Sequence, residues 1–206
     1  AAGLKRVSEN SPAPVDPAAI SAILISHEHS DHIKSCAALS RRHDLPVYAS
    51  AQTLNAINAK SSQRPIPERD MRAITPGQDF YIGDINVTPF KTPHDAVCSV
   101  GYRLDVGAAS VAVATDIGHI SDSWMRVIEG TQLVLESGLG LEDFMEDALS
   151  GKTRIDIASG LSTLTGDEGV DSHWWLDPTR FQQAAATAAR ELGAQYPEFS
   201  DQMTEN

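Results

Sequence analysis

The sequence predicts an α/β fold, and three observations support that prediction. The chain has 206 residues, of which 41% are hydrophobic, so it can form one good-sized core or two small ones. Short apolar runs at 22–26 and 46–49 are each followed by a helical pattern, which is typical of strand–helix units. Two hairpin signals then follow, within 79–90 and 100–114.

The first part of the chain supplies two strand–helix pairs. The run at 22–26 predicts a buried strand, and residues 31–43 predict a helix with apolar inward positions. Residues 46–49 predict a second, short strand. Ser50 then caps a helix that extends through Ala59. Polar or proline-bearing stretches predict loops at 1–20 and 60–72.

The middle of the chain predicts antiparallel pairs and one further helix. Strands at 79–82 and 85–90 are joined by Gly83-Asp84, which is a hairpin signal. A second hairpin joins 100–106 to 110–114 through a turn at Gly107. The elements expected after it are a helix from Ser121-Asp122 to Gly130, a buried strand at 133–135, a helix at 141–149, a strand at 154–158, a loop at 159–172 and a helix from Pro178 to Leu192.

A dense polar cluster lies between the first predicted strand and the first predicted helix, in Ser26-His-Glu-His-Ser-Asp-His32. Side chains alternate at the end of a strand, so His27 and His29 can point the same way while Glu28 points aside. Asp31 and His32 fall on the first helical turn and face the same space. Imidazole and carboxylate groups suit zinc, iron and manganese. The cluster therefore predicts a metal site, and its density disfavours the alternative of a turn with exposed histidines.

Two later residues stand where strands end and can extend this cluster. His94 follows a strand and Pro93, and Asp116 ends the most apolar strand of its region. Taken alone, His94 is equally well explained as a loop histidine, and Asp116 as a helix-capping carboxylate. Their combination with the cluster favours a ligand role for both.

The spacing His27-x-His29-x-Asp31-His32 resembles the H-x-H-x-D-H motif of the metallo-β-lactamase fold. Neighbouring stretches resemble its YycJ/WalJ-like branch, whose members are proposed to act as nucleases on phosphodiesters. These stretches are Thr-Pro-His-Asp-Ala around His94, Ala-Thr-Asp-Ile-Gly around Asp116, Leu-Pro-Val-Tyr-Ala from Leu45, Val-Thr-Pro-Phe from Val87, and Gly101-Tyr. The resemblance covers residues 3–136 and implies a partial αββα sandwich. The residues after Leu135-Glu136-Ser137 lack the branch's continuation, including the histidine that completes its second metal site.

The resemblance also implies a site for two divalent metal ions, with zinc expected and manganese or iron as alternatives. His27, His29 and His94 would hold the first ion, Asp31 and His32 the second, and Asp116 would bridge them. Two such ions lower the pKa of a shared water and clamp phosphate oxygens. A metal-activated hydroxide would then attack the phosphodiester, and Asp31 would also orient that nucleophile if only one ion is bound. Nucleic acid is the expected substrate.

The C-terminal residues resemble a different family, the zinc- and manganese-binding solute-binding proteins of ABC importers. The matching stretches are Gly138-Leu-Gly-Leu-Glu-Asp-Phe-Met, Ile157-Ala-Ser-Gly-Leu and Asp171-Ser-His-Trp-Trp-Leu-Asp-Pro178. In that family the histidine of the last element, here His173, binds the metal. Packing of His173 beside Trp174 and Trp175 explains it equally well. We therefore predict an incomplete metallo-β-lactamase-like domain at 1–136 and an α/β segment at 137–206.

Two functions follow from these resemblances. The first is a metal-dependent hydrolase of the phosphodiesterase or nuclease type, and the alternative is a non-catalytic zinc- or manganese-binding module. The formal net charge of −12 argues against general nucleic-acid binding by charge alone, although a site metal supplies local positive charge. The sequence shows no membrane-spanning run and no signal peptide, which predicts a cytoplasmic protein. The importer resemblance would instead indicate export, and the oligomeric state is left open.

Overall fold

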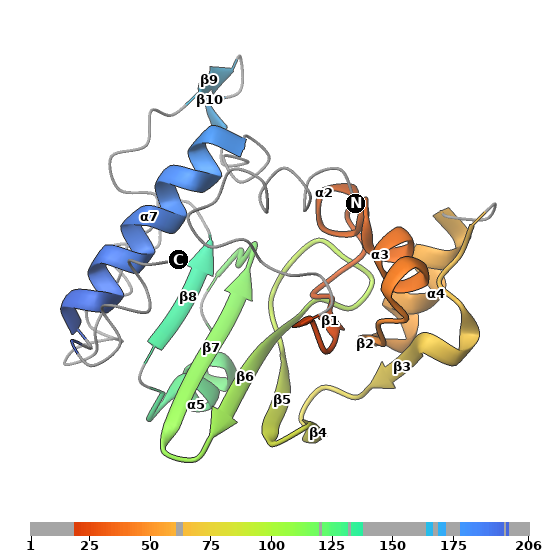
Figure 1. Ribbon diagram of the computed structural model, residues 1–206, viewed down its shortest axis with the longest axis horizontal. Coiled ribbons are helices and arrows are strands. Elements are labelled where there is room, and N and C mark those ends of the chain that lie inside the picture. Colours follow the sequence, from red (N-terminus) through yellow and green to blue (C-terminus); the bar gives the residue numbers. More distant parts are fainter. Residues whose placement is uncertain are drawn as a thin grey trace. The chain divides into compact units, whose positions relative to one another are not determined.

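The computed structural model describes residues 19–60, 64–119, 121–131, 133–137, 164–166, 169–171, 178–195 and 197. The chain divides into two compact units. The larger unit is Ile20–Arg154, and the smaller combines Ala1–Ala19 with Ile155–Asn206. The larger unit contains two sheets and every residue of the predicted two-metal site, so it is the unit that positions the chemistry (Figure 1).

A three-stranded parallel sheet opens the larger unit. Its strand order is β1 (Ile23–Leu24), β2 (Val47–Ser50) and β3 (Met71–Ile74). Parallel neighbours need crossover connections, which here contain helices α3 (Cys36–His43) and α4 (Ala51–Lys60). One apolar core joins these helices to the sheet, and its members include Ile25, Ile33, Cys36, Val47, Leu54 and Ile57. Burial raises the pKa of the Cys36 thiol to about 11.

The second sheet of the larger unit has five strands in sequence order (Figure 1). These are β4 (Phe80–Ile82), β5 (Ile85–Lys91), β6 (Val100–Val106), β7 (Ala109–Thr115) and β8 (Leu133–Ser137). Neighbours from β4 to β7 pair antiparallel, whereas β8 runs parallel to β7. The hairpin turns contain Gly83 at φ 61° and Gly107 at φ 56°, a left-handed conformation that glycine adopts readily.

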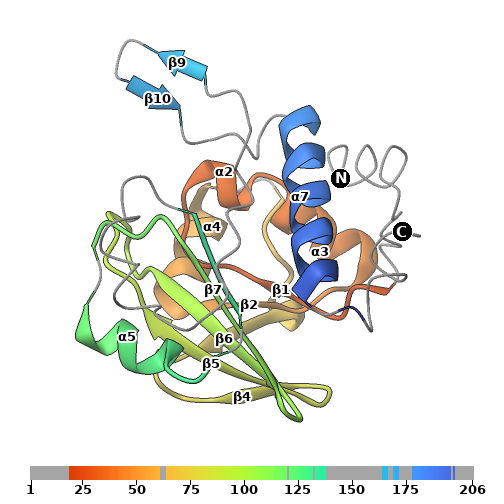
Figure 2. The same cartoon turned by 90° about the vertical axis from the view of Figure 1, so that its left-hand side faces the viewer.

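Helix α5 (Asp122–Ile128) provides the crossover between β7 and β8 and packs on the second sheet (Figure 2). Its N-cap is Ser121, whose Oγ accepts a hydrogen bond from the backbone N–H of Trp124 at 3.3 Å. Trp124 and Ile128 are fully buried in a core with Phe90 and Ala112. This shared core packs α5 against β5 and β7.

Two hydrogen bonds join the sheets directly before the histidine cluster. The hydroxyl of Tyr102 donates to the carbonyl oxygen of Ile25 at 2.8 Å. The backbone N–H of Val100 donates to the carbonyl oxygen of Ser26 at 3.1 Å. Strand β6 is thus bonded to the segment that leads into His27.

Most predicted elements of the larger unit are confirmed, but two predictions need correction. The helix expected at 31–43 is split into α2 (Ser30–Ile33) and α3, because the chain turns at Lys34 and Ser35. The loop expected at 60–72 ends in a 3₁₀ turn at Glu68–Asp70 and in strand β3. The two middle residues of β3 are exposed, so the strand lacks the apolar alternation that would reveal it.

The smaller unit contains a short antiparallel hairpin and a long helix. The hairpin pairs β9 (Leu164–Gly166) with β10 (Gly169–Asp171). The prediction of a loop throughout 159–172 is therefore wrong. The Gly- and Thr-rich sequence of this segment lacks the apolar pattern that would have indicated the two strands. Helix α7 (Pro178–Gln195) confirms the expected helix and extends beyond Leu192. The helix predicted at 141–149 and the strand at 154–158 lie outside the described residues. Among the residues described, no helix has the length and apolarity needed to cross a bilayer.

Replacing Gly101 with alanine should destabilise the larger unit. A Cβ at this position would collide with the ring of Phe90, its partner across β5 and β6, and would lie 2.9 Å from the carbonyl oxygen of Val113. We expect Gly101→Ala to lower the free energy of unfolding by about 1–3 kcal/mol, as for other overpacked sites. Urea denaturation measures this change. Ala109→Ser, at an exposed position of β7, is the control and should change the stability by less than about 0.5 kcal/mol. An unaltered midpoint for Gly101→Ala would contradict the close packing.

Candidate metal centre

Three chain segments of the larger unit bring the predicted ligands together. The first follows β1 and carries His27, His29 and, on α2, His32. The second links β5 to β6 and carries His94, and the third follows β7 and carries Asp116. The site is therefore built at strand ends from residues far apart in sequence.

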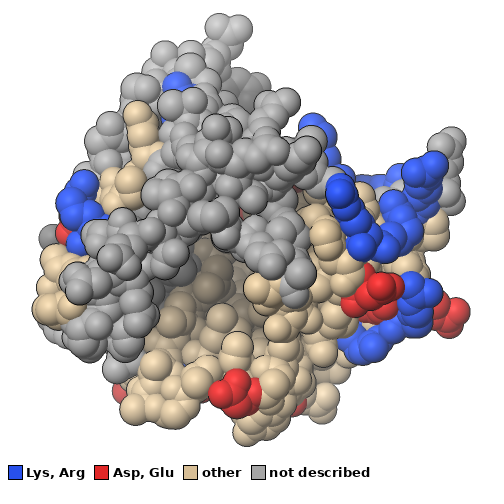
Figure 3. All heavy atoms as spheres, in the orientation of Figure 1, with Lys and Arg blue, Asp and Glu red and all other residues tan. Residues whose placement is uncertain are grey.

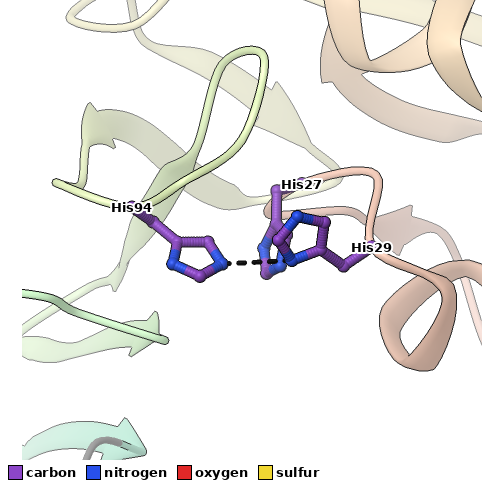
Figure 4. Close-up of side chains that lie close together, drawn as sticks. All are labelled: His27, His29 and His94. Carbon is purple, nitrogen blue, oxygen red and sulfur yellow. Dashed lines mark hydrogen bonds between the residues drawn. The ribbon is translucent and has the colours of Figure 1, made fainter.

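Three imidazoles form one set of donors. Ring nitrogens of His27, His29 and His94 lie within 4.8 Å of one another, and Figure 4 shows the three rings pointing toward one another. Nε2 of His94 is 3.2 Å from Nδ1 of His29. Nitrogen donors at such separations can converge on one ion, and three histidines are a common ligand set for zinc.

A second set of donors shares His27. It comprises His27, His32 and Asp116, whose candidate ligand atoms again lie within 4.8 Å of one another. Nε2 of His32 is 3.0 Å from Oδ2 of Asp116 and 3.2 Å from Oδ2 of Asp31. The structure thus places Asp31 beside His32 but outside both sets, while Asp116 lies with His32. The assignment of individual ligands stays a prediction.

The surroundings of His27 fit a metal ion. His27 is fully buried, and its Nδ1 is hydrogen-bonded to Oγ of Ser26 at 3.0 Å. Its Nε2 is also buried and has no hydrogen-bond partner among the described residues. Leaving a buried polar atom unsatisfied costs about 1–3 kcal/mol, and a bound cation would remove that cost. If Nε2 binds a metal, Nδ1 carries the proton and its N–H donates a hydrogen bond to Oγ of Ser26.

A hydroxyl pair supports this orientation of His27. The Oγ1 of Thr115, the last residue of β7, donates to Oγ of Ser26 at 3.3 Å. Hydrogen bonds of this kind fix the tautomer and ring orientation of metal-binding histidines. Sequence reasoning missed both hydroxyl residues. The signal was present, since each directly precedes a predicted ligand, His27 or Asp116.

Asp116 has a backbone conformation unusual for a residue with a side chain. Its φ is 53°, in the left-handed region that aspartate tolerates better than most residues. Such conformations cluster at functional sites, where the surrounding structure enforces them. Here the turn directly after β7 brings the carboxylate to His32.

The charges around the cluster favour a neutral His27 and an ionised pair beside it. Burial, followed by the positive charges of His32 and His94, lowers the pKa of His27 from 6.5 to about 4. Burial opposes the charged form of His32 too, but the hydrogen bond to Asp116 and the charges of Asp116 and Asp31 raise its pKa overall. Burial would raise the pKa of Asp116, yet the hydrogen bond and charge of His32 lower it. His27 is therefore in the neutral form that binds metal.

Glu28 belongs to neither donor set and connects two loops of the metal centre. Its side chain is buried, and Oε1 accepts a hydrogen bond from the backbone N–H of Val97 at 2.9 Å. Its own carbonyl oxygen accepts a hydrogen bond from Nζ of Lys60 at 2.9 Å. Val97 belongs to the loop that carries His94, so Glu28 holds that loop against the segment that carries His27 and His29.

Paired sheets with histidine and aspartate side chains gathered at their strand ends define a fold of the metallo-β-lactamase class. The chain belongs to this superfamily, because residues 2–196 match the Beta-lactamase superfamily domain. The α/β fold class predicted from the sequence is thereby confirmed. The match continues past residue 136, whereas the predicted boundary there and the importer resemblance stay predictions. His173 lies outside the described residues.

Particular relatives of the chain are nucleases by name. It is 37% identical over 124 residues to the exodeoxyribonuclease YycJ of Bacillus anthracis, covering 60% of this chain and 46% of the relative. It is 27% identical over 157 residues to the exodeoxyribonuclease WalJ of Streptococcus pneumoniae, covering 76% of this chain and 58% of the relative. The chain thus spans about half the length of these curated relatives. Family and relatives together support a metal-dependent hydrolase.

Two solved structures show the same fold. Zinc-bound PqqB from Methylobacterium extorquens has a TM-score of 0.52 at 19% identity, covering 65% of this chain and 52% of PqqB. A metallo-β-lactamase from Cronobacter sakazakii has a TM-score of 0.50 at 15% identity, covering 98% of this chain and 81% of that one. At such low identity these likenesses describe architecture alone.

Removing the Glu28 carboxylate should weaken metal binding without changing a ligand. We expect Glu28→Ala to lower the affinity for Zn²⁺ about 10–100-fold, the usual effect of losing a group that orients ligands. Glu28→Gln keeps a hydrogen-bond acceptor for the Val97 N–H, so its affinity for Zn²⁺ should fall much less. Competition with a chromophoric chelator measures the affinity, and Glu129→Ala, at an exposed position after α5, is the control. Equal affinities for the alanine variant and the wild type would contradict the role of this hydrogen bond.

Acid should destabilise the metal-free protein through His27. Because its folded-state pKa of about 4 lies below the ordinary 6.5, the unfolded chain binds more protons between these values, and stability falls as the pH drops from 6.5 toward 4. At about 1.4 kcal/mol per pH unit, this contribution amounts to about 2 kcal/mol between pH 6.5 and 5. Urea denaturation of wild type and His27→Gln at both pH values isolates it. A loss that is the same in both proteins would show that His27 is not responsible.

Proposed function

We propose that this protein is a metal-dependent phosphodiesterase of the nuclease type, which uses two divalent ions, with zinc as the expected metal. The observation that carries the proposal is that His27 belongs to two donor sets, in each of which the candidate ligand atoms lie within 4.8 Å of one another. The exodeoxyribonuclease names of two relatives support nucleic acid as the substrate.

Five of the candidate residues would bind the ions, and two others would orient a ligand or the attacking water. His27, His29 and His94 would hold one ion, while His32 and Asp116 would contribute to the second. Bound ions would acidify a water molecule and clamp the phosphate oxygens. Ser26 keeps the imidazole of His27 in one orientation. Asp31, whose Oδ2 lies 3.2 Å from Nε2 of His32, would orient the attacking water.

Metal analysis combined with a phosphodiesterase assay tests this proposal. We expect two ions per chain and hydrolysis of bis-p-nitrophenyl phosphate. Removing a residue that hydrogen-bonds a metal ligand already lowers metal affinity or activity about 10–100-fold. Removing a ligand itself, in His29→Ala, should therefore lower the rate of hydrolysis by more than about 100-fold. His43→Ala is the matched control, because His43 ends α3 and belongs to neither donor set.

The same measurements distinguish the enzyme from a non-catalytic metal-binding module. A single tightly bound ion that is lost in His173→Ala, together with no turnover, would favour a module related to importer proteins. Bound metal without any turnover, insensitive to His173→Ala, would indicate an inactive hydrolase fold. Either result would overturn the proposed activity.

A further inference from the structure

Positive charge gathers on one side of the larger unit, although the whole chain has a formal net charge of −12. The segment 33–72 has seven Lys and Arg residues against three acidic ones, a formal charge of +4. Figure 3 shows Lys and Arg side chains along the edge where α3, α4 and β3 lie in Figure 1. We call this surface the basic face, and its members are Lys34, Arg41, Arg42, Lys60, Arg64, Arg69 and Arg72.

Contacts connect four members of the basic face, Arg41, Arg64, Arg69 and Arg72, into one surface. The guanidinium of Arg41 on α3 donates to the backbone carbonyls of Arg64 and Pro65. Arg69 pairs with Asp44, which ends α3, at 2.8 Å, and Arg72 donates to the carbonyl oxygen of Arg69 at 2.6 Å. Cations from α3, from the segment before β3 and from β3 itself therefore lie side by side.

The acidic residues within the segment neutralise only part of this charge. Asp44 is paired with Arg69 at the surface, and Asp70 is buried with Nε of Arg69 3.6 Å from its carboxylate. The side chains of Arg42, Lys60 and Arg64 are all exposed. A concentrated positive surface on an otherwise acidic protein attracts polyanions and repels other acidic surfaces.

One end of the basic face lies at the metal centre. Nζ of Lys60, at the end of α4, donates to the carbonyl oxygen of Glu28 at 2.9 Å. Glu28 lies between His27 and His29 in the chain. A polymer with one phosphodiester at the donor sets would therefore have Lys60 beside it, and a strand that continues past Lys60 along α4 would run toward the other cations of the basic face.

We propose that the basic face binds the phosphate backbone of a DNA strand whose scissile phosphodiester occupies the metal centre. This proposal rests on the proposed function and extends it to a surface outside the donor sets. Lys and Arg residues that neutralise phosphates supply sequence-independent, salt-dependent affinity. The overall acidity of the chain would keep that affinity local to this surface.

Arg42 and Arg64 are the residues to test, because their side chains are exposed and they belong to neither donor set. The probe is a fluorescein-labelled single-stranded DNA with phosphorothioate linkages, which resist cleavage, and the protein is loaded with Zn²⁺. We expect Arg42→Gln combined with Arg64→Gln to weaken binding at low salt at least about 10-fold. The slope of log affinity against log salt should fall by about 0.7 for each cation removed. Fluorescence anisotropy measures both.

A small substrate separates this proposal from the proposed function. Bis-p-nitrophenyl phosphate has a single phosphodiester and cannot extend over the basic face, so the double variant should hydrolyse it at the wild-type rate. On unmodified DNA, the double variant should show a raised KM with an unchanged kcat. Absence of bis-p-nitrophenyl phosphate hydrolysis in the wild type would overturn the proposed function, whereas the anisotropy result tests the basic face independently.

Arg126→Gln is the matched control, since Arg126 is an exposed cation on α5, outside segment 33–72. It should bind the DNA as the wild type does. Equal binding by the double variant and the wild type would overturn the proposal. So would an equal loss in Arg126→Gln, because general charge rather than this surface would then attract DNA. Urea denaturation of each variant verifies that the fold is intact.

Discussion

Burial of one neutral imidazole is the constraint on which the metal centre depends. His27 lies where two sets of donors meet, and its Nε2 is enclosed without a hydrogen-bond partner in the described part of the chain. In a protein without a metal this arrangement would only cost stability. The ring keeps its position because Ser26 is hydrogen-bonded to its Nδ1 and Thr115 is hydrogen-bonded to Ser26. In addition, both sheets form hydrogen bonds with the Ile25–Ser26 segment that precedes His27. Affinity for a cation is thus built into the fold at the expense of the metal-free state.

The connection between the two sheets explains how such a site is kept in place. The Ile25–Ser26 segment accepts hydrogen bonds from Tyr102 and Val100 of β6, so the loop that carries His27 and His29 is attached to the second sheet. The loop that carries His94 is attached to the same segment through Glu28 and Val97. Asp116 follows β7, which pairs with β6. Each of the three donor-carrying segments is therefore connected to β6, directly or through a neighbouring segment.

The sequence predicted the elements that have a strong local pattern and missed those that depend on neighbours. Alternating apolar residues and the glycine turns identified β4 to β7, and proline at its first turn identified α7. Strand β3 was missed because its middle residues are exposed, so its sequence lacks an apolar strand pattern. Its extended conformation is stabilised by pairing with β2. The six expected ligands could be selected because four of them stand in a dense motif and the other two, His94 and Asp116, follow predicted strands. Thr115 has a weak local signal, since it directly precedes Asp116, but its bond to Ser26 joins residues 89 apart in sequence. The contact between Val97 and Glu28 joins residues 69 apart, and no local pattern indicates it.

Charge is distributed over the larger unit in a way that the net value conceals. A formal charge of −12 indicates a protein that repels nucleic acid, and a metal centre alone would offset this only over a short range, since ions screen charges beyond about 8–10 Å at physiological salt. A strand of several nucleotides extends farther than that. It would meet an unfavourable surface unless cations lay beside the centre. Lys60 contacts the segment between His27 and His29, and under our proposal the other cations of the basic face would continue that path. The acidic remainder of the chain would then limit binding to strands aligned with the metal centre, which favours cleavage over unproductive adsorption.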